Sequence, residues 1–147
     1  MATTRSKSNG GGGDHEPKPA PLVAIVDDDA SVRQSSDRLI RSFGFRTQIF
    51  ASGREFLSSV ASGNAACVLL DMRMPEMDGL EIQRALAERG ARTPIVFLTG
   101  RASEEEERRA RSAGAVAFLR KPVNQASLRQ AIDSVVARGD RNGNRDS

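Results

Sequence analysis

The chain has 147 residues, a formal net charge of +3 and 38% hydrophobic residues. This length predicts one domain with a substantial hydrophobic core. Residues 21–137 carry 16 basic and 15 acidic side chains, so this nearly neutral segment does not indicate nucleic-acid binding. No apolar stretch approaches the roughly 20 residues of a membrane helix, and the first residues form no apolar signal segment. Because Cys67 is the only cysteine, no disulfide can form within the chain, and we expect a cytoplasmic protein without a membrane partner.

The composition predicts three segments along the chain. Residues 1–20 are rich in Gly, Ser, Thr, Pro and Lys, which predicts a flexible leader without a core. Residues 138–147 are polar and rich in Gly, Asn and Arg, which predicts a frayed, flexible tail. The domain itself is therefore expected over residues 21–137.

Short apolar runs alternate with helical patterns through this domain. The runs cover residues 22–26, 67–70, 94–98 and 116–119, and residues 46–50 are expected to form a short second strand. Runs of this length, separated by helices, are typical of buried parallel strands. Five β-α units with right-handed crossovers predict an α/β fold, a doubly wound three-layer α/β/α sandwich around a five-stranded parallel sheet.

The helices are predicted from apolar spacing and from capping residues. We expect them at about 31–43, after Ser52, from Asp78-Gly79 to about 89, at 103–113 and at 124–137. Gly44 and Gly90 are expected to end the first and third of these helices. The short helix after Ser52 is expected to carry Val60 with its apolar side chains. The last helix has an i, i+3, i+4, i+7 apolar stripe, which predicts that it faces the core.

Polar side chains follow four of the strands at the point where each ends. Asp27, Asp28 and Asp29 follow the first expected strand, Asp71 follows the third, Thr99 the fourth, and Arg120, Lys121 and Pro122 the fifth. The carboxyl ends of parallel strands meet at one edge of the sheet, where ligands bind in such folds. The sequence therefore predicts a site for a divalent metal and a phosphoryl group at this edge.

The residue types fit Mg²⁺, which prefers oxygen ligands and often shares them with phosphate. Asp28 and Asp71 could bind the ion directly and Asp27 through water, whereas Asp29 is expected to face the start of the first helix. Any one of these carboxylates could instead be an ordinary helix N-cap, and it is their combination with Thr99 and Lys121 that favours the site. Lys121 is also the only lysine between residues 21 and 137.

These segments together resemble the receiver domain of two-component response regulators. The resemblance covers residues 22 to about 137 and is carried by Ile25-Val-Asp-Asp-Asp29, Asp71-Met-Arg-Met-Pro75, Asp78-Gly79, Thr99-Gly100 and Lys121-Pro122. It is closest to receivers that precede LuxR-like helix-turn-helix domains. It implies a flavodoxin-like sheet with strand order 2-1-3-4-5.

The resemblance also implies a role for each matching residue. Asp71 is the implied phosphoacceptor, and Asp27, Asp28, Asp71 and the backbone carbonyl of Arg73 are the implied Mg²⁺ ligands. Thr99 and Lys121 would each bind a phosphoryl oxygen. Gly100 would leave room for the phosphoryl group, and the Lys121–Pro122 bond would be cis, as in the family.

Three further positions bear on switching and on phosphoryl lifetime. Phe118 stands where the family places its switch aromatic, although simple core packing explains it equally well. As a hypothesis, Thr99 moves inward on phosphorylation and Phe118 turns into the space that it vacates. Arg73 and Arg101 flank the site, and a guanidinium there could either hold the phosphoryl group or compete with Mg²⁺. Val123 follows Pro122, at a position where the family frequently has an aromatic residue.

The helix at 103–113 has little apolar surface. Ser103 and Glu106 form a predicted capping box, and three i,i+4 pairs follow: Glu104–Arg108, Glu105–Arg109 and Glu107–Arg111. Its apolar side chains are only alanines. The helix could be a solvated, salt-bridged surface helix, which is the usual interpretation. Our hypothesis is that it is loosely docked and that phosphorylation reorders it.

We expect a stand-alone receiver, because no output domain fits before Ser147. Its partners would be a histidine kinase or histidine phosphotransfer protein, and a downstream protein bound through the fourth helix, fifth strand and fifth helix. A phosphorelay intermediate or phosphate sink remains an alternative. A small Mg²⁺ phosphatase is less favoured, because such enzymes need Asp where Arg73 stands. We thus expect a phosphoacceptor capable of self-dephosphorylation rather than an enzyme, with no nucleic-acid partner.

Overall fold

The computed structural model describes residues 19–146, with side chains described up to residue 137. Nearly all of the predicted leader therefore lies outside the described residues. The elements, in chain order, are β1 (Leu22–Val26), α1 (Ala30–Ser42), β2 (Arg46–Phe50), α2 (Gly53–Leu57), α3 (Ala61–Asn64), β3 (Cys67–Leu70), α4 (Gly79–Glu88), β4 (Ile95–Thr99), α5 (Glu104–Ser112), β5 (Ala117–Arg120) and α6 (Gln125–Asp146).

The described strands form one parallel sheet with the order β2-β1-β3-β4-β5. This confirms both the predicted doubly wound α/β fold and the implied strand order. Val26 at the end of β1 lies beside Phe50 of β2 and Leu70 of β3, so the carboxyl ends of these three strands are level. Residues that follow β1 and β3 consequently start from neighbouring points on one edge of the sheet.

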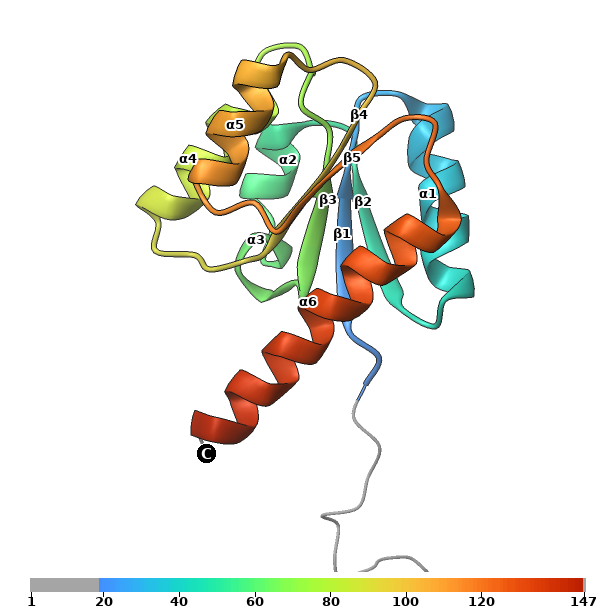
Figure 1. Cartoon of the computed structure of the whole chain (residues 1–147), viewed down its shortest axis with the longest axis vertical. Helices are drawn as coiled ribbons and strands as arrows, with labels where there is room; N and C mark the ends of the chain where they lie inside the picture. Colours follow the sequence, from blue (N-terminus) through green and yellow to red (C-terminus); the bar gives the residue numbers. More distant parts are fainter. Residues whose placement is uncertain (1–18, 147) are drawn as a thin grey trace, which may run out of the picture.

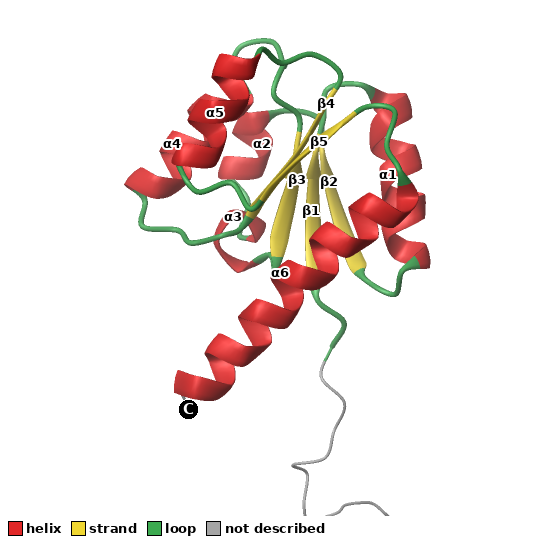
Figure 2. Ribbon diagram, viewed as in Figure 1, coloured by secondary structure: helices red, strands yellow, loops and turns green. Residues whose placement is uncertain are grey.

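Helices cover both faces of the sheet (Figures 1 and 2). α1 and α6 lie on one face, and α2, α4 and α5 lie on the other. The apolar side chains form two clusters that match these layers. Ala24 and Val26 of β1 belong to the cluster under α2 and α4, whereas Val23 and Ile25 belong to the cluster under α1 and α6. Strands buried on both faces read as continuous apolar runs, which is why they could be predicted.

Two glycines end helices as predicted. Gly44 follows α1 with φ +99° and Gly90 follows α4 with φ +74°. This left-handed backbone conformation costs a glycine little, because it has no Cβ to collide with the following carbonyl oxygen. The turns after these helices therefore depend on glycine.

The region after Ser52 differs from the prediction. Ser52 caps α2 as expected, but α2 ends at Leu57 and a separate helical turn, α3, begins at Ala61. Val60 precedes α3 and is 76% exposed, so it does not belong to the buried side of the helix. Ser59 interrupts the helix, because its hydroxyl accepts a hydrogen bond from the backbone N–H of Ala61 at 3.0 Å.

The last helix is longer than predicted. α6 continues to Asp146, nine residues beyond the expected end near Ala137. The apolar stripe that predicts a helix stops at this point, but no proline follows to interrupt the backbone hydrogen bonds, so the backbone remains helical. The prediction that this segment frays is a separate matter and stays a prediction. No helix within residues 19–146 is long and apolar enough to cross a membrane.

The ion pairs of α5 form only in part as predicted. Arg111 Nε lies 3.1 Å from Glu107 Oε2, as expected. Arg108 contacts Glu105 instead of Glu104. Positions three and four apart are both neighbours on a helix, and Arg108 uses the nearer one. Glu105 therefore has Arg108 rather than Arg109 as its partner.

Candidate functional site

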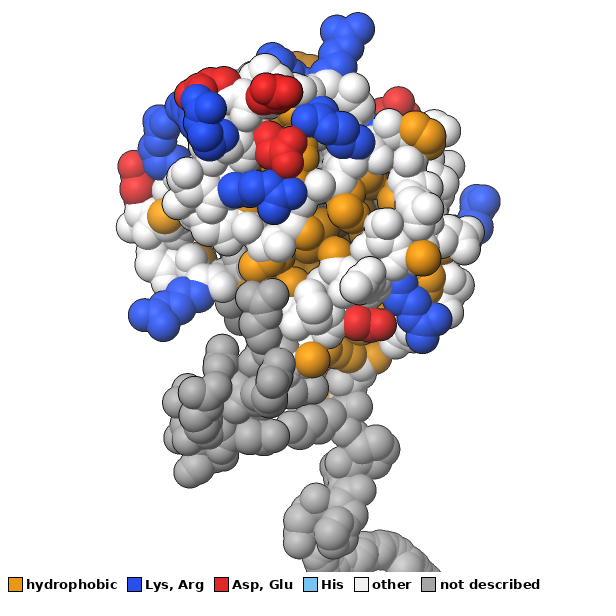
Figure 3. All heavy atoms as spheres, in the orientation of Figure 1, with side chains coloured by type: hydrophobic (Ala, Val, Ile, Leu, Met, Phe, Trp, Pro, Cys, Tyr) orange, Lys and Arg blue, Asp and Glu red, His pale blue; other side chains and the backbone are white. Residues whose placement is uncertain are grey.

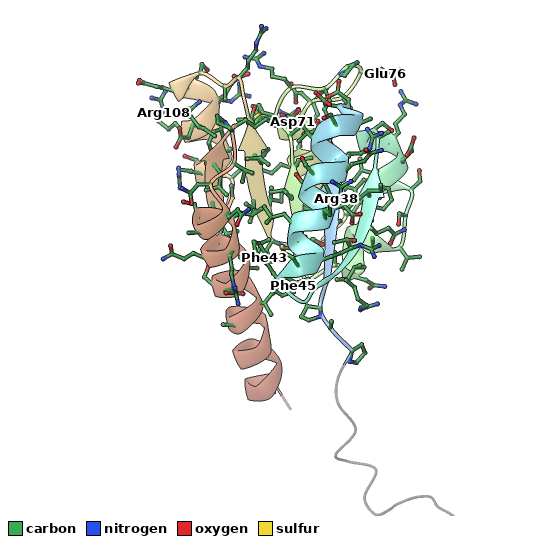
Figure 4. All side chains as sticks on the ribbon, turned by 90° about the vertical axis from the view of Figure 1, so that its right-hand side faces the viewer. Arg38, Phe43, Phe45, Asp71, Glu76 and Arg108 are labelled. Carbon is green, nitrogen blue, oxygen red and sulfur yellow. The ribbon has the colours of Figure 1, made fainter. Side chains whose placement is uncertain are left out.

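An acidic pocket forms at the carboxyl ends of β1 and β3. Asp27 and Asp28 follow β1 and Asp71 follows β3, and one carboxylate oxygen from each lies within 4.8 Å of the others. Asp27 and Asp71 are buried, and Asp28 is exposed. Figure 4 shows Asp71 near one end of the sheet, far from Phe43 and Phe45 at the other end. The structure thus brings together the three carboxylates that the sequence predicted, and we call these residues the acidic pocket.

Lys121 reaches this pocket from the loop after β5. Its Nζ lies 2.9 Å from Asp27 Oδ2 and 3.5 Å from Asp71 Oδ2. The backbone N–H of Lys121 donates to the carbonyl oxygen of Thr99 at 2.9 Å, which fixes the loop to the end of β4. The Lys121–Pro122 bond is cis, as the resemblance implied. The ammonium therefore bridges two members of the acidic pocket from the loop after β5, which lies two places from β3 and three from β1 in the sheet.

The charges of the pocket are unevenly balanced. Burial raises the pKa of the Asp71 carboxyl above its usual value, and the charge of Asp27 raises it further. Lys121 and the backbone N–H of Arg73 act in the opposite direction on this pKa without restoring it. Burial tends to lower the pKa of Lys121, but the hydrogen bond to Asp27 and the charges of both carboxylates outweigh it, so this pKa is raised. Negative charge therefore predominates, which favours binding of a further cation.

Asp27 and Asp29 have different partners although they are close in sequence. Asp27 Oδ1 accepts the backbone N–H of Asp29 at 2.9 Å, while its other oxygen faces Lys121. Asp29 Oδ1 accepts the backbone N–H groups of Ser31 and Val32 at 2.9 and 3.3 Å. Asp29 is thus the N-cap of α1, as predicted, and lies outside the acidic pocket.

Thr99 and Phe118 lie beside the pocket, inside the protein. Thr99 is fully buried, and its hydroxyl donates to the carbonyl oxygen of Arg101 at 2.9 Å. Phe118 is 8% exposed and its ring centroid lies 5.6 Å from that of Phe97. The guanidinium carbon of Arg120 lies 5.5 Å above the Phe118 ring. In this structure Phe118 therefore packs inward as a core residue, and Thr99 is bound to the loop that follows it.

Sequence reasoning missed the packing role of Gly79 at the pocket. A Cβ at this position would lie 2.6 Å from Cε1 of Phe97 and 2.8 Å from the backbone oxygen of Asp71. Real Cβ atoms essentially never come this close, so a side chain at position 79 would displace the segment that carries Asp71. The sequence marks Gly79 only as the start of α4, because close approach between distant segments leaves no local pattern. At Gly100, by contrast, a Cβ would make ordinary contacts with the Lys121 side chain, at 3.7 and 3.8 Å.

Two arginines support the pocket in ways that the sequence did not indicate. Arg33 Nη1 donates to the backbone oxygen of Asp27 at 2.8 Å. Arg73 donates its backbone N–H to Asp71 Oδ1 at 3.4 Å, and its guanidinium Nη2 lies 2.7 Å from Glu106 Oε1 on α5. The predicted role of the Arg73 carbonyl in metal binding stays a prediction.

Arg101, the other arginine predicted to flank the site, contacts Thr99 through its backbone: its N–H donates to the Thr99 hydroxyl oxygen at 3.1 Å.

The pocket has the donors that a hard divalent cation needs. Carboxylate oxygens from Asp27, Asp28 and Asp71 converge from two adjacent strand ends, and the ammonium of Lys121 forms ion pairs with two of these carboxylates. Mg²⁺ is commonly held by one or two carboxylates together with water and phosphate oxygens. The observed donor set therefore fits Mg²⁺ beside a phosphoryl group.

Comparison with known proteins identifies one family. Residues 23–133 match the response regulator receiver domain family. The response regulator protein TmoT of Ectopseudomonas mendocina is 41% identical over 111 residues, covering 76% of this chain and 50% of TmoT. Nodulation protein W of Bradyrhizobium diazoefficiens is 38% identical over 143 residues, covering 97% of this chain and 62% of that protein. The chain spans about half the length of the TmoT-like relatives.

A solved structure agrees with these sequence comparisons. The response regulator StyR superimposes with a TM-score of 0.78 and is 38% identical, covering 86% of this chain and 65% of the StyR chain. The likeness to StyR thus includes the sequence as well as the fold. The fold, the acidic pocket and the sequence relatives are thus mutually consistent.

Proposed function

Because the chain belongs to the response regulator receiver family, we propose that Asp71 accepts a phosphoryl group and that this changes the protein's interactions with partners. The donor would be a histidine kinase or a histidine phosphotransfer protein. The observation that carries the proposal is the position of Asp71, which lies beside two further carboxylates and the Lys121 ammonium at the edge of the sheet. The stand-alone character of the protein stays a prediction.

The proposed reaction is a nucleophilic displacement at phosphorus. A carboxylate oxygen of Asp71 forms a P–O bond while the P–N bond to the donor imidazole breaks, and the electron pair of that bond stays on the imidazole nitrogen. Asp27, Asp28, Asp71 and the backbone carbonyl of Arg73 would hold Mg²⁺. When bound, this ion supplies positive charge that neutralises the phosphoryl oxygens.

Lys121 and Thr99 would bind the transferred group. Lys121 already lies within 3.5 Å of Asp71 Oδ2, so its ammonium needs little movement to pair with a phosphoryl oxygen. The Thr99 hydroxyl donates to Arg101 and would have to leave that acceptor to donate to the phosphoryl group. Phe118 would then turn toward the space that Thr99 leaves. Unchanged rotamer populations of the Phe118 ring after phosphorylation, observed by NMR, would contradict this last step.

Two alternatives differ in the partners that they require. A phosphorelay intermediate or phosphate sink would use the same Asp71 chemistry but need no phospho-dependent partner beyond the proteins that exchange phosphoryl groups with it. A small Mg²⁺ phosphatase would need an acid-base carboxyl two residues after Asp71. That position is Arg73, whose guanidinium lies against Glu106, so this class is disfavoured.

The first test is phosphoryl uptake. The purified chain is incubated with Mg²⁺ and acetyl phosphate, and its intact mass is compared with that of an Asp71→Ala variant. We expect one added phosphoryl group in the native chain, and none in the variant or when Mg²⁺ is chelated. Uptake by the Asp71→Ala variant would place the acceptor elsewhere. If the native chain takes up none, the same mixture with a phosphorylated histidine kinase domain decides whether Asp71 is an acceptor at all.

A further inference from the structure

α5 is held to the domain by very little apolar surface. Of the residues in α5, only Ala110 is buried. Ala102 before the helix and Ala115 after it are partly buried against the same core cluster. Methyl groups of alanine bury little area, so the hydrophobic effect stabilises this docking only weakly. Other interactions must account for the position of α5.

Polar contacts provide the remaining connections. Gln83 Nε2 of α4 donates to the backbone oxygen of Ala110 at 3.0 Å, in a buried environment. Arg120 Nη2 of β5 donates to Glu107 Oε1 at 2.9 Å, and its Nη1 donates to the backbone oxygen of Ala102 at 3.2 Å. Arg73 Nη2 lies 2.7 Å from Glu106 Oε1. In Figure 3, arginine and glutamate side chains are interspersed over the part of the surface where Figure 1 shows α5.

The Arg73–Glu106 ion pair differs from the other contacts because it joins α5 to the acidic pocket. Arg73 stands two residues after Asp71, and its backbone N–H donates to Asp71 Oδ1. Glu106 Oε1 accepts both the Arg73 guanidinium and, at 2.9 Å, the backbone N–H of Ser103 that starts the helix. The side chain of Glu106 is only 19% exposed, whereas that of Arg73 is 55% exposed. One oxygen atom therefore connects the first turn of α5 to the segment that carries Asp71.

We propose that Arg73 exchanges partners when Asp71 is phosphorylated, leaving Glu106 for the phosphoryl group and so loosening the first turn of α5. This inference rests on the function proposed for Asp71. A phosphoryl group brings up to two negative charges and three acceptor oxygens, and the forked guanidinium binds such a group better than a single carboxylate. Arg73 is thus a positioning residue that links the charge at Asp71 to the docking of α5.

The exchange also removes a cation from an acidic helix terminus. Glu104 to Glu107 form the first turn of α5, and Arg73 approaches them from outside the helix. Once Arg73 leaves, repulsion among these carboxylates is less compensated, although the helix dipole still favours negative charge there. Glu107 keeps Arg111 and Arg120, whose hydrogen bonds lower its pKa, so the loosening should be confined to the side of Glu106.

The test is amide hydrogen exchange over residues 103–112 in the full chain, with and without Mg²⁺ and acetyl phosphate. The informative variant is Glu106→Gln, because a glutamine at this position can still cap Ser103 but cannot pair with Arg73 as an anion. Glu107→Gln is the matched control, since it removes the same negative charge one residue away, weakens the ion pairs with Arg111 and Arg120, and leaves the Arg73–Glu106 pair in place. Intact mass of each sample reports how much phosphoryl group it carries.

We expect phosphorylation to accelerate exchange at the start of α5 by about two- to fivefold in the native chain and in Glu107→Gln, the range typical of losing one exposed ion pair. Glu106→Gln should exchange faster from the outset and respond little to phosphorylation. The contrary result is that phosphorylation accelerates amide exchange in Glu106→Gln as much as in the native chain, with phosphoryl uptake established by mass. That result would overturn the exchange of partners and leave the role of Asp71 intact. No uptake in any chain, including with a phosphorylated kinase domain, would overturn both.

Discussion

The last two helices of the chain, α5 and α6, dock on the sheet by different means. α6 places Leu128 and Ile132, both with no exposed surface, into the cluster that it shares with α1. α5 buries only Ala110, and arginine and glutamine side chains from other elements supply its remaining contacts. Apolar packing is insensitive to charge at the edge of the sheet, whereas ion pairs respond to it directly. Under the exchange of partners proposed for Arg73, α5 is thus the helix whose docking a phosphoryl group at Asp71 would alter.

The largest expected contrast lies in the stability of the two helices. Ile132→Ala should lower the free energy of unfolding by about 2–5 kcal/mol, because it removes a fully buried side chain and leaves a cavity. Arg108→Ala on α5 should change it by less than about 1 kcal/mol, because an exposed ion pair contributes little. Urea unfolding followed by circular dichroism measures both. An equal loss in the two variants would mean that α5 is as firmly packed as α6.

A smaller loss is expected at the edge of the sheet. Gly79→Ala should lower the free energy of unfolding by about 1–3 kcal/mol, because its Cβ would press on the backbone of Asp71 and on Phe97. It should also reduce phosphoryl uptake at Asp71, since the acceptor would be displaced. Gly63→Ala is the matched control, because a Cβ there meets nothing within 4 Å. Equal stability of the two variants would show that the backbone at Asp71 can shift to accommodate a Cβ at position 79 with little loss of stability.

The same contrast explains what could be predicted from sequence. Strands such as Leu22–Val26 are buried on both faces, so each leaves an unbroken apolar run, and the residues after them could be assigned to one edge. The acidic pocket could therefore be predicted residue by residue. α6 was predicted from its apolar stripe, but its end was wrong because the stripe stops before the backbone helix does.

Contacts that depend on side-chain reach could not be predicted in this way. The Arg73–Glu106 ion pair joins positions 33 residues apart, and no local pattern marks it. Either Glu104 or Glu105 could pair with Arg108, because residues three and four apart on a helix are both neighbours, and the sequence spacing does not favour one of them. Similarly, Val60 was expected in a helix because an apolar spacing does not reveal that Ser59 interrupts it.

The acidic pocket should also make stability depend on pH. Because the pKa of Asp71 is raised in the folded protein, the folded state binds this proton more tightly than the unfolded state. The resulting stabilisation is present at low pH and is lost as the pH rises through the raised pKa. Asp71→Asn does not titrate, so at neutral pH and without metal it should be more stable than the native chain, by on the order of 1 kcal/mol for the repulsion that it removes.

Thermal unfolding at pH 4 and pH 7 separates this effect from simple packing. The stability advantage of Asp71→Asn should shrink toward the lower pH, and added Mg²⁺ should narrow it at pH 7 by stabilising the native chain alone. A constant difference between the two chains at both pH values would contradict the charge balance inferred for the pocket. Ser62→Ala, a change at a buried hydroxyl away from the pocket, controls for general effects of pH.

The smallest expected effect concerns the ion pairs of α5 themselves. Amides of residues 104–112 should exchange faster than those of residues 126–137 in α6, and raising the salt concentration from 0.05 to 0.5 M should accelerate only the former, by about twofold, because salt screens exposed charges. Slow exchange in both helices would contradict the weak docking of α5. Fast exchange that salt does not change would instead assign the docking of α5 to the buried bond from Gln83, which salt screens little, and the Arg73–Glu106 ion pair would then be too weak to transmit a charge at Asp71.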